Sequence, residues 1–245
     1  MKYEVRDTHY SDLIKNIRSY FSEAKNSIWD RRNKIKVISF DKEDITIKSF
    51  KIPHFMNKIA YTLFRDSKAK RSYDNSTKIL EFVPKPIGYA EYEKFGLLHD
   101  SYFICEKYVY DFTIREPLIE KNFEDRENIF KQFAVFTHAL HMQEVKHLDY
   151  SPGNILIKKM NDETYEFKII DVNRMQFKNL TDIERLENFS KLWAQDKDLS
   201  IIIDSYAKLI EMDADEAFNI AVKASQKHKD KKNLKKRLKG KKVVD

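Results

Sequence analysis

Cysteine, glycine and proline are scarce in this chain of 245 residues, which contains one cysteine, four glycines and five prolines. The single cysteine, Cys105, excludes an intrachain disulfide and is compatible with a reducing compartment. So little glycine and proline argues against a loop-rich or disordered chain. Because 42% of the residues are hydrophobic, the chain can bury the core of one two-lobed domain or of two small packed domains.

Long apolar segments are also lacking. The N-terminal residues Met1–Asp7 contain neither the apolar segment nor the cleavage signature of a signal peptide. No segment approaches the roughly 18 uninterrupted apolar residues that a membrane-spanning helix requires. We therefore expect a cytoplasmic protein.

Positive charge is concentrated at the C-terminus. The net charge is +7, and residues 226–245 contain ten Lys or Arg residues against two Asp residues, so the rest of the chain is close to neutral. Three interpretations of this basic tail remain open: a solvated, disordered end, an attraction to anionic lipid or to a phosphate-rich glycolipid, and nucleic-acid binding. We do not expect nucleic-acid binding, because neither interleaved aromatic residues nor a nucleic-acid-binding motif accompanies the charge.

Hydrophobic periodicity predicts strands with some helices in the first part of the chain and mainly helices later, which is an α+β pattern. The predicted strands are 36–40, 45–50, 87–89, 102–106, 155–157 and 167–170. The predicted helices are 11–33, 66–80, 129–143 and the region 182–224. The first two strands are expected to form a hairpin through residues 41–44.

The densest chemical signal begins at His147 and has the pattern His-x-Asp-x-x-x-x-Asn, followed by a predicted hairpin and a strand that ends in Asp171. Phosphoryl transfer needs one carboxylate to orient the attacking hydroxyl and accept its proton, and other oxygen ligands to hold Mg²⁺. Asp149 suits the first role, and Asn154 and Asp171 suit the second. His147 is interpreted as a structural support of this loop.

These residues resemble the catalytic loop and the Mg²⁺-binding Asp of the protein kinase superfamily. The resemblance continues upstream, because Lys48 on a predicted strand matches the lysine that holds the ATP phosphates. It implies ATP and Mg²⁺ as cofactors and a backbone hinge for adenine at Glu106 and Tyr108. The implied fold has two lobes: a β-rich N-lobe over 1–105 and a helical C-lobe over 106–225, followed by the basic tail at 226–245.

More narrowly, the sequence is similar to the bacterial lipopolysaccharide core kinases. Four segments carry the similarity: 47–51, 67–73, 83–89 and 170–175. The similarity implies phosphorylation of Kdo or heptose, on a lipid-linked or small sugar substrate, at the inner face of the cell membrane. The basic tail would then be drawn to an anionic membrane surface.

Three departures from the kinase pattern leave alternatives open. No glycine-rich loop precedes Lys48, and no clear glutamate follows it, so Asp74 is the acid best placed to support Lys48. Only about ten residues separate Asp171 from the next helical pattern, which favours a small or lipid-linked acceptor over a protein. A kinase for an aminoglycoside or choline-like compound, and a pseudokinase scaffold, are the alternatives.

Overall fold

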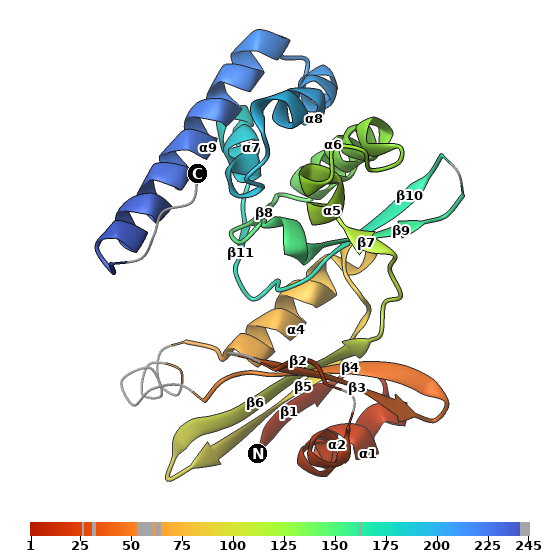
Figure 1. The fold of residues 1–245 in the computed structure, drawn as a ribbon. Helices are drawn as coiled ribbons and strands as arrows, with labels where there is room; N and C mark the ends of the chain where they lie inside the picture. Colours follow the sequence, from red (N-terminus) through yellow and green to blue (C-terminus); the bar gives the residue numbers. More distant parts are fainter. Residues whose placement is uncertain (26, 31–32, 53–60, 62–64, 162, 241–245) are drawn as a thin grey trace. The chain divides into compact units, whose positions relative to one another are not determined.

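The structure, a computed structural model, describes residues 1–25, 27–30, 33–52, 61, 65–161 and 163–240 (Figure 1). It divides into two units. The first unit consists of Met1–Val109 with Asp171–Arg174, and the second of Tyr110–Ile170 with Met175–Asp245. The predicted α+β composition is confirmed, with the large sheet in the first unit and most of the helices in the second (Figure 1).

Within its described residues, the first unit is built on a six-stranded sheet with the strand order β1-β5-β6-β4-β3-β2. Its paired strands are antiparallel. The strands are β1 (Lys2–Val5), β2 (Ser27–Asp30), β3 (Lys34–Phe40), β4 (Glu43–Ser49), β5 (Pro86–Lys94) and β6 (Leu97–Glu106). The predicted hairpin is therefore confirmed as β3–β4, with β4 in the interior of the sheet beside β6.

The β3–β4 turn is tighter than the four residues predicted for it. Phe40 pairs with Glu43, so only Asp41 and Lys42 connect the two strands. Both have positive φ values, 47° and 71°, and two consecutive left-handed residues are the geometry of the two-residue turns whose twist matches paired strands. The turn therefore reaches this conformation without glycine.

Helices cover both faces of this sheet (Figure 1). One face packs on α1 (Ser11–Lys15) and α2 (Ile17–Glu23) through a core that includes Ile45, Ile47 and Ile104. The other face packs on α4 (Lys68–Lys78) through a smaller cluster of Phe50, Ala69, Tyr73 and Tyr89, with Phe103 against it. Because side chains alternate along a strand, Lys48 points to the face that carries α4.

The second unit combines short strands with five α-helices among its described residues. The strands are β7 (Phe112–Thr113), β8 (Val145–His147), β9 (Ile155–Lys159), β10 (Tyr165–Ile169) and β11 (Met175–Phe177). They form two small antiparallel sheets, β10-β9-β7 and β11-β8. The helices are α5 (Arg115–Ile119), α6 (Arg126–Met142), α7 (Asp182–Glu187), α8 (Asp196–Leu209) and α9 (Ala214–Arg237).

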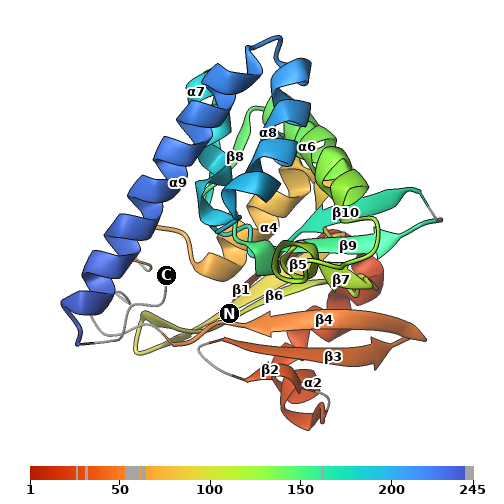
Figure 2. The same ribbon diagram turned by 45° about the horizontal axis from the view of Figure 1, so that its top comes forward.

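An aromatic cluster forms the core of the second unit, where α6 and α8 lie side by side (Figure 2). The rings of Phe133 and Tyr150 stack with centroids 5.7 Å apart, and Phe189 contacts both Phe133 and Tyr206 at 6.1 and 5.1 Å. Burying one such ring contributes about 1.5–3 kcal/mol. The loop that contains Tyr150 is thereby attached to the helical core.

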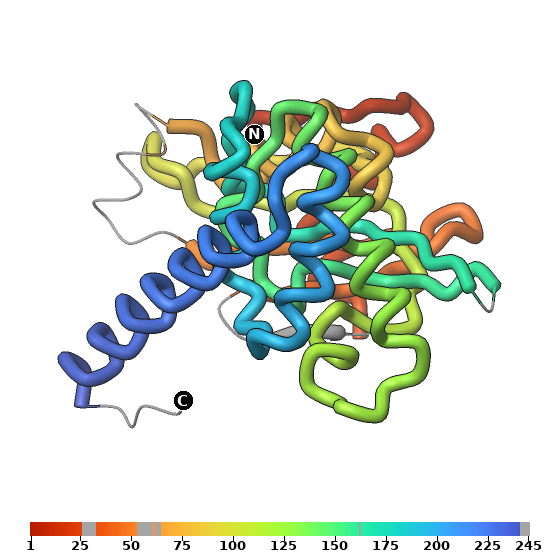
Figure 3. Tube along the Cα trace, turned by 90° about the horizontal axis from the view of Figure 1, so that it is seen from above, coloured from red at the N-terminus to blue at the C-terminus, as the bar shows by residue number. Residues whose placement is uncertain are grey.

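Two predicted elements are wrong in extent. The helix predicted over 11–33 is interrupted at Asn16 and ends at Glu23, and Ser27–Asp30 forms strand β2 instead. Pairing with β3 outweighs the local helical pattern there. At the other end, α9 continues to Arg237, so most of the basic tail is helical rather than disordered (Figure 3).

Among the described residues, no helix combines the length and apolarity needed to cross a membrane.

Candidate active site

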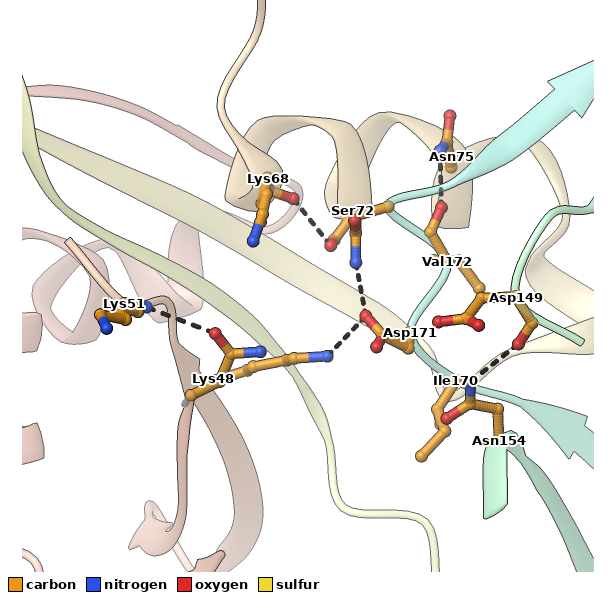
Figure 4. A network of polar contacts seen from close by, with 12 residues as sticks. Lys48, Lys51, Lys68, Ser72, Asn75, Asp149, Asn154, Ile170, Asp171 and Val172 are labelled. Carbon is orange, nitrogen blue, oxygen red and sulfur yellow. Dashed lines mark hydrogen bonds and ion pairs between the residues drawn. The ribbon is translucent and has the colours of Figure 1, made fainter. Parts of the chain in front are cut away.

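Lys48 lies on the interior strand β4, opposite Phe103 of β6. Its side chain is only 15% exposed, and its ammonium group forms an ion pair with Asp171, with Nζ–Oδ1 at 2.8 Å (Figure 4). The two residues are 123 positions apart in the sequence and belong to the same unit. The fold therefore brings the predicted phosphate-binding lysine and the predicted metal-binding carboxylate into direct contact.

The predicted pairing of Lys48 with Asp74 does not occur. Asp74 lies on α4, where its carboxylate accepts a hydrogen bond from Lys70 Nζ at 2.6 Å. Residues four apart on a helix are surface neighbours, so Lys70 reaches this carboxylate without any long-range arrangement. The acid that supports Lys48 is Asp171 instead.

The backbone around Asp171 is held by two asparagines. Asp171 has a φ of 60°, a left-handed conformation that Asp and Asn adopt more readily than most residues. Asn75 on α4 donates a hydrogen bond to the carbonyl of Val172 at 2.6 Å (Figure 4), and the amide of Asn173 donates to Asp171 Oδ1. The Asn75 contact attaches the segment 171–174 to α4 in the first unit, and the Asn173 contact joins two side chains within that segment.

Asp171 also lines a basic pocket of about 340 Å³ in the first unit. Its cationic lining residues are Arg65, Lys68, Arg71 and Arg174, and Asp171 is the acid among its described lining residues. Burial lowers the pKa of the Arg71 guanidinium, and the nearby charges of Arg65 and Arg174 lower it further against the opposing effects of Tyr61 and Asp66. The pocket thus carries an excess of positive charge, which suits an anionic ligand.

In the second unit, His147 supports the loop that contains Asp149. Its Nδ1 accepts a hydrogen bond from the backbone N–H of Asp149 at 3.0 Å, and its Nε2 lies 3.1 Å from the carbonyl of Ile170. One neutral tautomer, with the proton on Nε2, satisfies both contacts. The ring is only 1% exposed, so it acts within the fold rather than toward a ligand.

Asn154 completes this loop. Its Nδ2 donates to the carbonyl of Asp149 at 2.9 Å (Figure 4), and its own carbonyl accepts from the N–H of Ile170 at 2.9 Å. Its side-chain amide is thus oriented with the nitrogen toward the loop, which leaves the oxygen as the group that can serve a metal. Asp171 follows Ile170 directly in the chain.

Tyr150 attaches the same loop to α6. It is fully buried, and its hydroxyl lies 2.8 Å from Thr137 Oγ1 on α6. Burial raises the pKa of the Tyr150 hydroxyl far above its usual range, so the phenol remains neutral. Asp149 itself is half-buried, between a buried histidine and a buried tyrosine that hold its backbone.

The predicted hinge residues lie where the first unit ends. Glu106 is the last residue of β6, and its N–H donates to the carbonyl of Lys85 at 2.9 Å. Its carboxylate pairs with Lys85 at 2.8 Å. Tyr108 follows two residues later, next to the boundary between the units at Val109. Lys85 thus holds the backbone at Glu106.

Oxygen donors of the kind that bind Mg²⁺ are present in each unit. Among the described residues, no three His, Cys, Asp or Glu side chains gather into a cluster that could hold a metal by themselves. Mg²⁺ is usually bound through one or two protein oxygens together with substrate phosphates and water. Asp171 in the first unit and Asn154 in the second each carry one oxygen donor of that kind.

Sequence reasoning missed Asn75 and the four cations of the basic pocket. The segments 67–73 and 170–175 are similar to the core kinases, but the sequence alone does not explain why they contain basic residues. The structure supplies the reason, since α4 and the residues after Asp171 line one pocket. Asn75 left no separate signal, because an Asn within a polar helix is ordinary.

The sheet lobe, the helical lobe and the loop that carries Asp149 together define a protein-kinase-like fold. A solved structure described as WaaP in complex with acyl carrier protein matches with a TM-score of 0.62, covering 93% of this chain and 98% of that chain. The identity is 11%, so this likeness establishes the fold. The expected kinase-like architecture is confirmed.

The model of the Lipopolysaccharide kinase (Kdo/WaaP) family matches residues 82–212, more than half of the chain. The chain belongs to this family, and it is a kinase that acts on a sugar of lipopolysaccharide. No curated protein sequence matches it.

Proposed function

We propose that this kinase transfers the terminal phosphate of ATP to a hydroxyl of Kdo or heptose in the lipopolysaccharide inner core, with Asp149 as the catalytic carboxylate. The ion pair between Lys48 and Asp171 carries the proposal. A largely buried lysine held by an acid 123 residues away has no role in the hydrophobic core. It is the arrangement that phosphate binding beside a metal requires.

Each remaining residue has a role within this proposal. Asp149 orients the acceptor hydroxyl and takes its proton, and His147 keeps the Asp149 backbone in place. Lys48 binds the α- and β-phosphates, and Glu106 and Tyr108 hold adenine through their backbone. Asn154 and Asp171 hold Mg²⁺, which when bound neutralises phosphate charge during transfer.

The charge of the first unit favours an acidic acceptor. The pocket beside Asp171 has four cationic lining residues, and a cationic acceptor such as an aminoglycoside would be repelled there. Kdo carries a carboxylate, whereas unmodified heptose is neutral. We therefore propose Kdo in preference to heptose as the acceptor sugar.

We further propose that the enzyme works at the inner face of the cell membrane as a peripheral protein. The basic residues of α9 and of the following segment would be attracted to anionic lipid, with about 1 kcal/mol for each Lys or Arg near the surface. Vesicle co-sedimentation at increasing salt tests this, since screening weakens such attraction. Binding that does not decrease with salt contradicts it.

The direct test of the enzymatic proposal is phosphate incorporation from labelled ATP into Kdo–lipid A and into a heptose-containing core. Asp149→Asn should abolish labelling, and Asp204→Asn, an exposed Asp of α8, is the matched control that should not. Equal labelling by wild type and Asp149→Asn would remove the role assigned to Asp149. Labelling of the heptose acceptor alone would overturn the preference for Kdo.

A further inference from the structure

A second basic depression lies entirely within the second unit, between α9 and the loop that carries Asp149. It has a volume of about 280 Å³. Its lining residues are Lys146, His147, Leu148, Glu187, Asn188, Ser190, Lys191, Ala224, Lys227, His228 and Lys231. We call it the α9 groove. Its size is at the small end of ligand sites, so it suits one sugar-sized or phosphate-sized group rather than a lipid chain.

The lining of the α9 groove is strongly cationic. Lys146, Lys191, Lys227 and Lys231 contribute to it together with His228, and Glu187 is the acid among its described lining residues. Glu187 is half-exposed and lies 3.7 Å from Lys146, so it offsets at most part of this charge. Lys227 and Lys231 are exposed and follow one another by four residues on α9, which places them on the same side of that helix.

Asn188, one of the lining residues of the groove, has a buried side-chain donor without an acceptor among the described residues. Asn188 is 4% exposed, and no described residue accepts a hydrogen bond from its Nδ2. Buried polar groups are nearly always paired. A side-chain amide donor in a lining of lysines is what an anionic oxygen would satisfy.

The groove is close to the catalytic carboxylate. Lys191 donates a hydrogen bond to the carbonyl of Leu148, the residue before Asp149. Burial and the charges of Lys191 and Lys232 lower the pKa of His228, and Asp149 acts on the same ring in the opposite direction. A group bound in the groove would therefore lie beside the loop at which the acceptor hydroxyl reacts.

We infer that the α9 groove is a subsite for a second anionic group of the acceptor, a phosphate or carboxylate separate from the hydroxyl that is phosphorylated. This inference rests on the proposed function and gives the basic helix a role in substrate recognition. Asn188 and the groove lysines bind the anion and so orient the glycolipid toward Asp149.

The test compares Lys227→Ala/Lys231→Ala with a matched double variant, Lys223→Ala/Lys235→Ala. The control residues are exposed on the same helix, do not line the groove, and change the net charge equally. With Kdo–lipid A that retains its phosphates, the groove variant should raise the acceptor KM by about tenfold or more, because two phosphate-binding charges are lost. Its KM for ATP and its kcat should remain those of wild type.

The same assay with the glycolipid after enzymatic removal of its phosphates identifies the anion. If the groove binds phosphate, the acceptor KM values of wild type and the groove variant should then become equal. If it binds the Kdo carboxylate, wild type should keep the lower acceptor KM. Either result supports the subsite. An acceptor KM that changes equally in the groove variant and in the control overturns it.

Direct binding separates this inference from the proposed function. Titration of Kdo–lipid A into the full chain without ATP requires no turnover, so loss of affinity in the groove variant alone supports the subsite even if no phosphate is transferred. Vesicles of phosphatidylglycerol without glycolipid supply the other source of phosphate. Loss of any two α9 lysines should weaken vesicle binding, so each loss is compared with that of the Lys223→Ala/Lys235→Ala control. If the groove variant loses more affinity than the control for the vesicles as well as for the glycolipid, the groove binds general lipid headgroups and the acceptor assignment is overturned.

Discussion

The two units hold their parts of the candidate site in different ways. In the first unit, the contacts of Lys48 and Asp171 are made by charged side chains that keep 15% and 25% of their surface exposed. In the second unit, Asp149 is held through its backbone by His147 and Asn154, above a fully buried Tyr150. A side-chain ion pair can exchange its partner for a phosphate, whereas a loop fixed by backbone hydrogen bonds keeps its geometry during a reaction. The difference suits a phosphate grip in one unit and a catalytic carboxylate in the other.

The largest expected effect belongs to Asp149. Asp149→Asn keeps the side-chain shape and the backbone contacts but removes the base, so kcat/KM should fall by about 10²–10⁴-fold. Because the loop is held by its backbone, the urea midpoint of unfolding should remain close to that of wild type. Steady-state kinetics and urea titration measure the two quantities. A large loss of stability would show that the carboxylate, rather than the backbone, holds this loop.

The next effect concerns a buried ion pair of the second unit. Asp198 is only 4% exposed at its side chain and pairs with Arg126 at 2.8 Å. Asp198→Ala leaves the Arg126 charge without its partner, so the free energy of unfolding should fall by about 3–5 kcal/mol. Chemical denaturation measures this change.

The control for Asp198 is Glu127→Ala on α6, since Glu127 forms an exposed pair with Lys131 at 2.7 Å. That change should leave the free energy of unfolding close to that of wild type, because solvent screens an exposed pair. If the two variants lose the same free energy of unfolding, burial does not determine how much an ion pair contributes here. The comparison between the two units would then lose its physical basis.

A smaller effect is expected for the Lys48–Asp171 ion pair of the first unit. Lys48→Met removes the charge that we propose binds the ATP phosphates, so kcat/KM for ATP should fall by about a hundredfold. Stability should fall less than in Asp198→Ala, because Asn173 still donates to Asp171 and the Asp171 side chain keeps 25% of its surface exposed, against 4% for Asp198. Lys51→Met, at an exposed position near the end of β4, is the control. A stability loss of several kcal/mol would contradict an adjustable grip.

How far these features could be predicted from sequence also differs between the two halves. The motif from His147 to Asn154 is contiguous, so its spacing alone indicated the loop and the strands β9 and β10 that follow it. The Lys48–Asp171 pair spans 123 positions, and local patterns cannot reveal which acid reaches a lysine. Asp74 was chosen because it lies on the helix after Lys48, but the nearer Lys70 takes its carboxylate. Strand β2 was missed for a similar reason, since its partner β3 determines its conformation.

The basic tail gives the same lesson. From its composition, a disordered end was one of three open interpretations, because ten like charges repel one another. Yet Ala217, Ala221 and Ser225 of α9 are buried, and they recur at intervals of four residues. Packing against α8 and the 188–191 turn extends the helix into the charged segment. A buried face of small residues is a weak signal beside so many lysines.

The smallest effect extends the comparison to acid pH. His141 of α6 is 1% exposed, and its Nδ1 lies 2.7 Å from the hydroxyl of Tyr206. Burial lowers the pKa of this imidazole to about 3, with smaller contributions from Arg185, Lys146 and His138. An unfolded histidine titrates near 6.5, so below that pH the unfolded chain binds a proton that the folded chain does not. The stability contributed by neutral His141 is therefore complete above about pH 6.5 and is lost as the pH falls toward about 3.

The measurement is the free energy of unfolding of wild type and of His141→Leu between pH 7 and pH 5. The difference between them should shift against wild type by up to about 1.4 kcal/mol per pH unit below 6.5, because one proton is taken up on unfolding. Leu140→Val, a substitution at the buried neighbour of His141, changes packing without a titrating group, so its difference from wild type should not depend on pH. If both differences in free energy of unfolding change with pH by the same amount, the acid sensitivity comes from elsewhere in the chain. His141 would then not make the core of the second unit sensitive to acid.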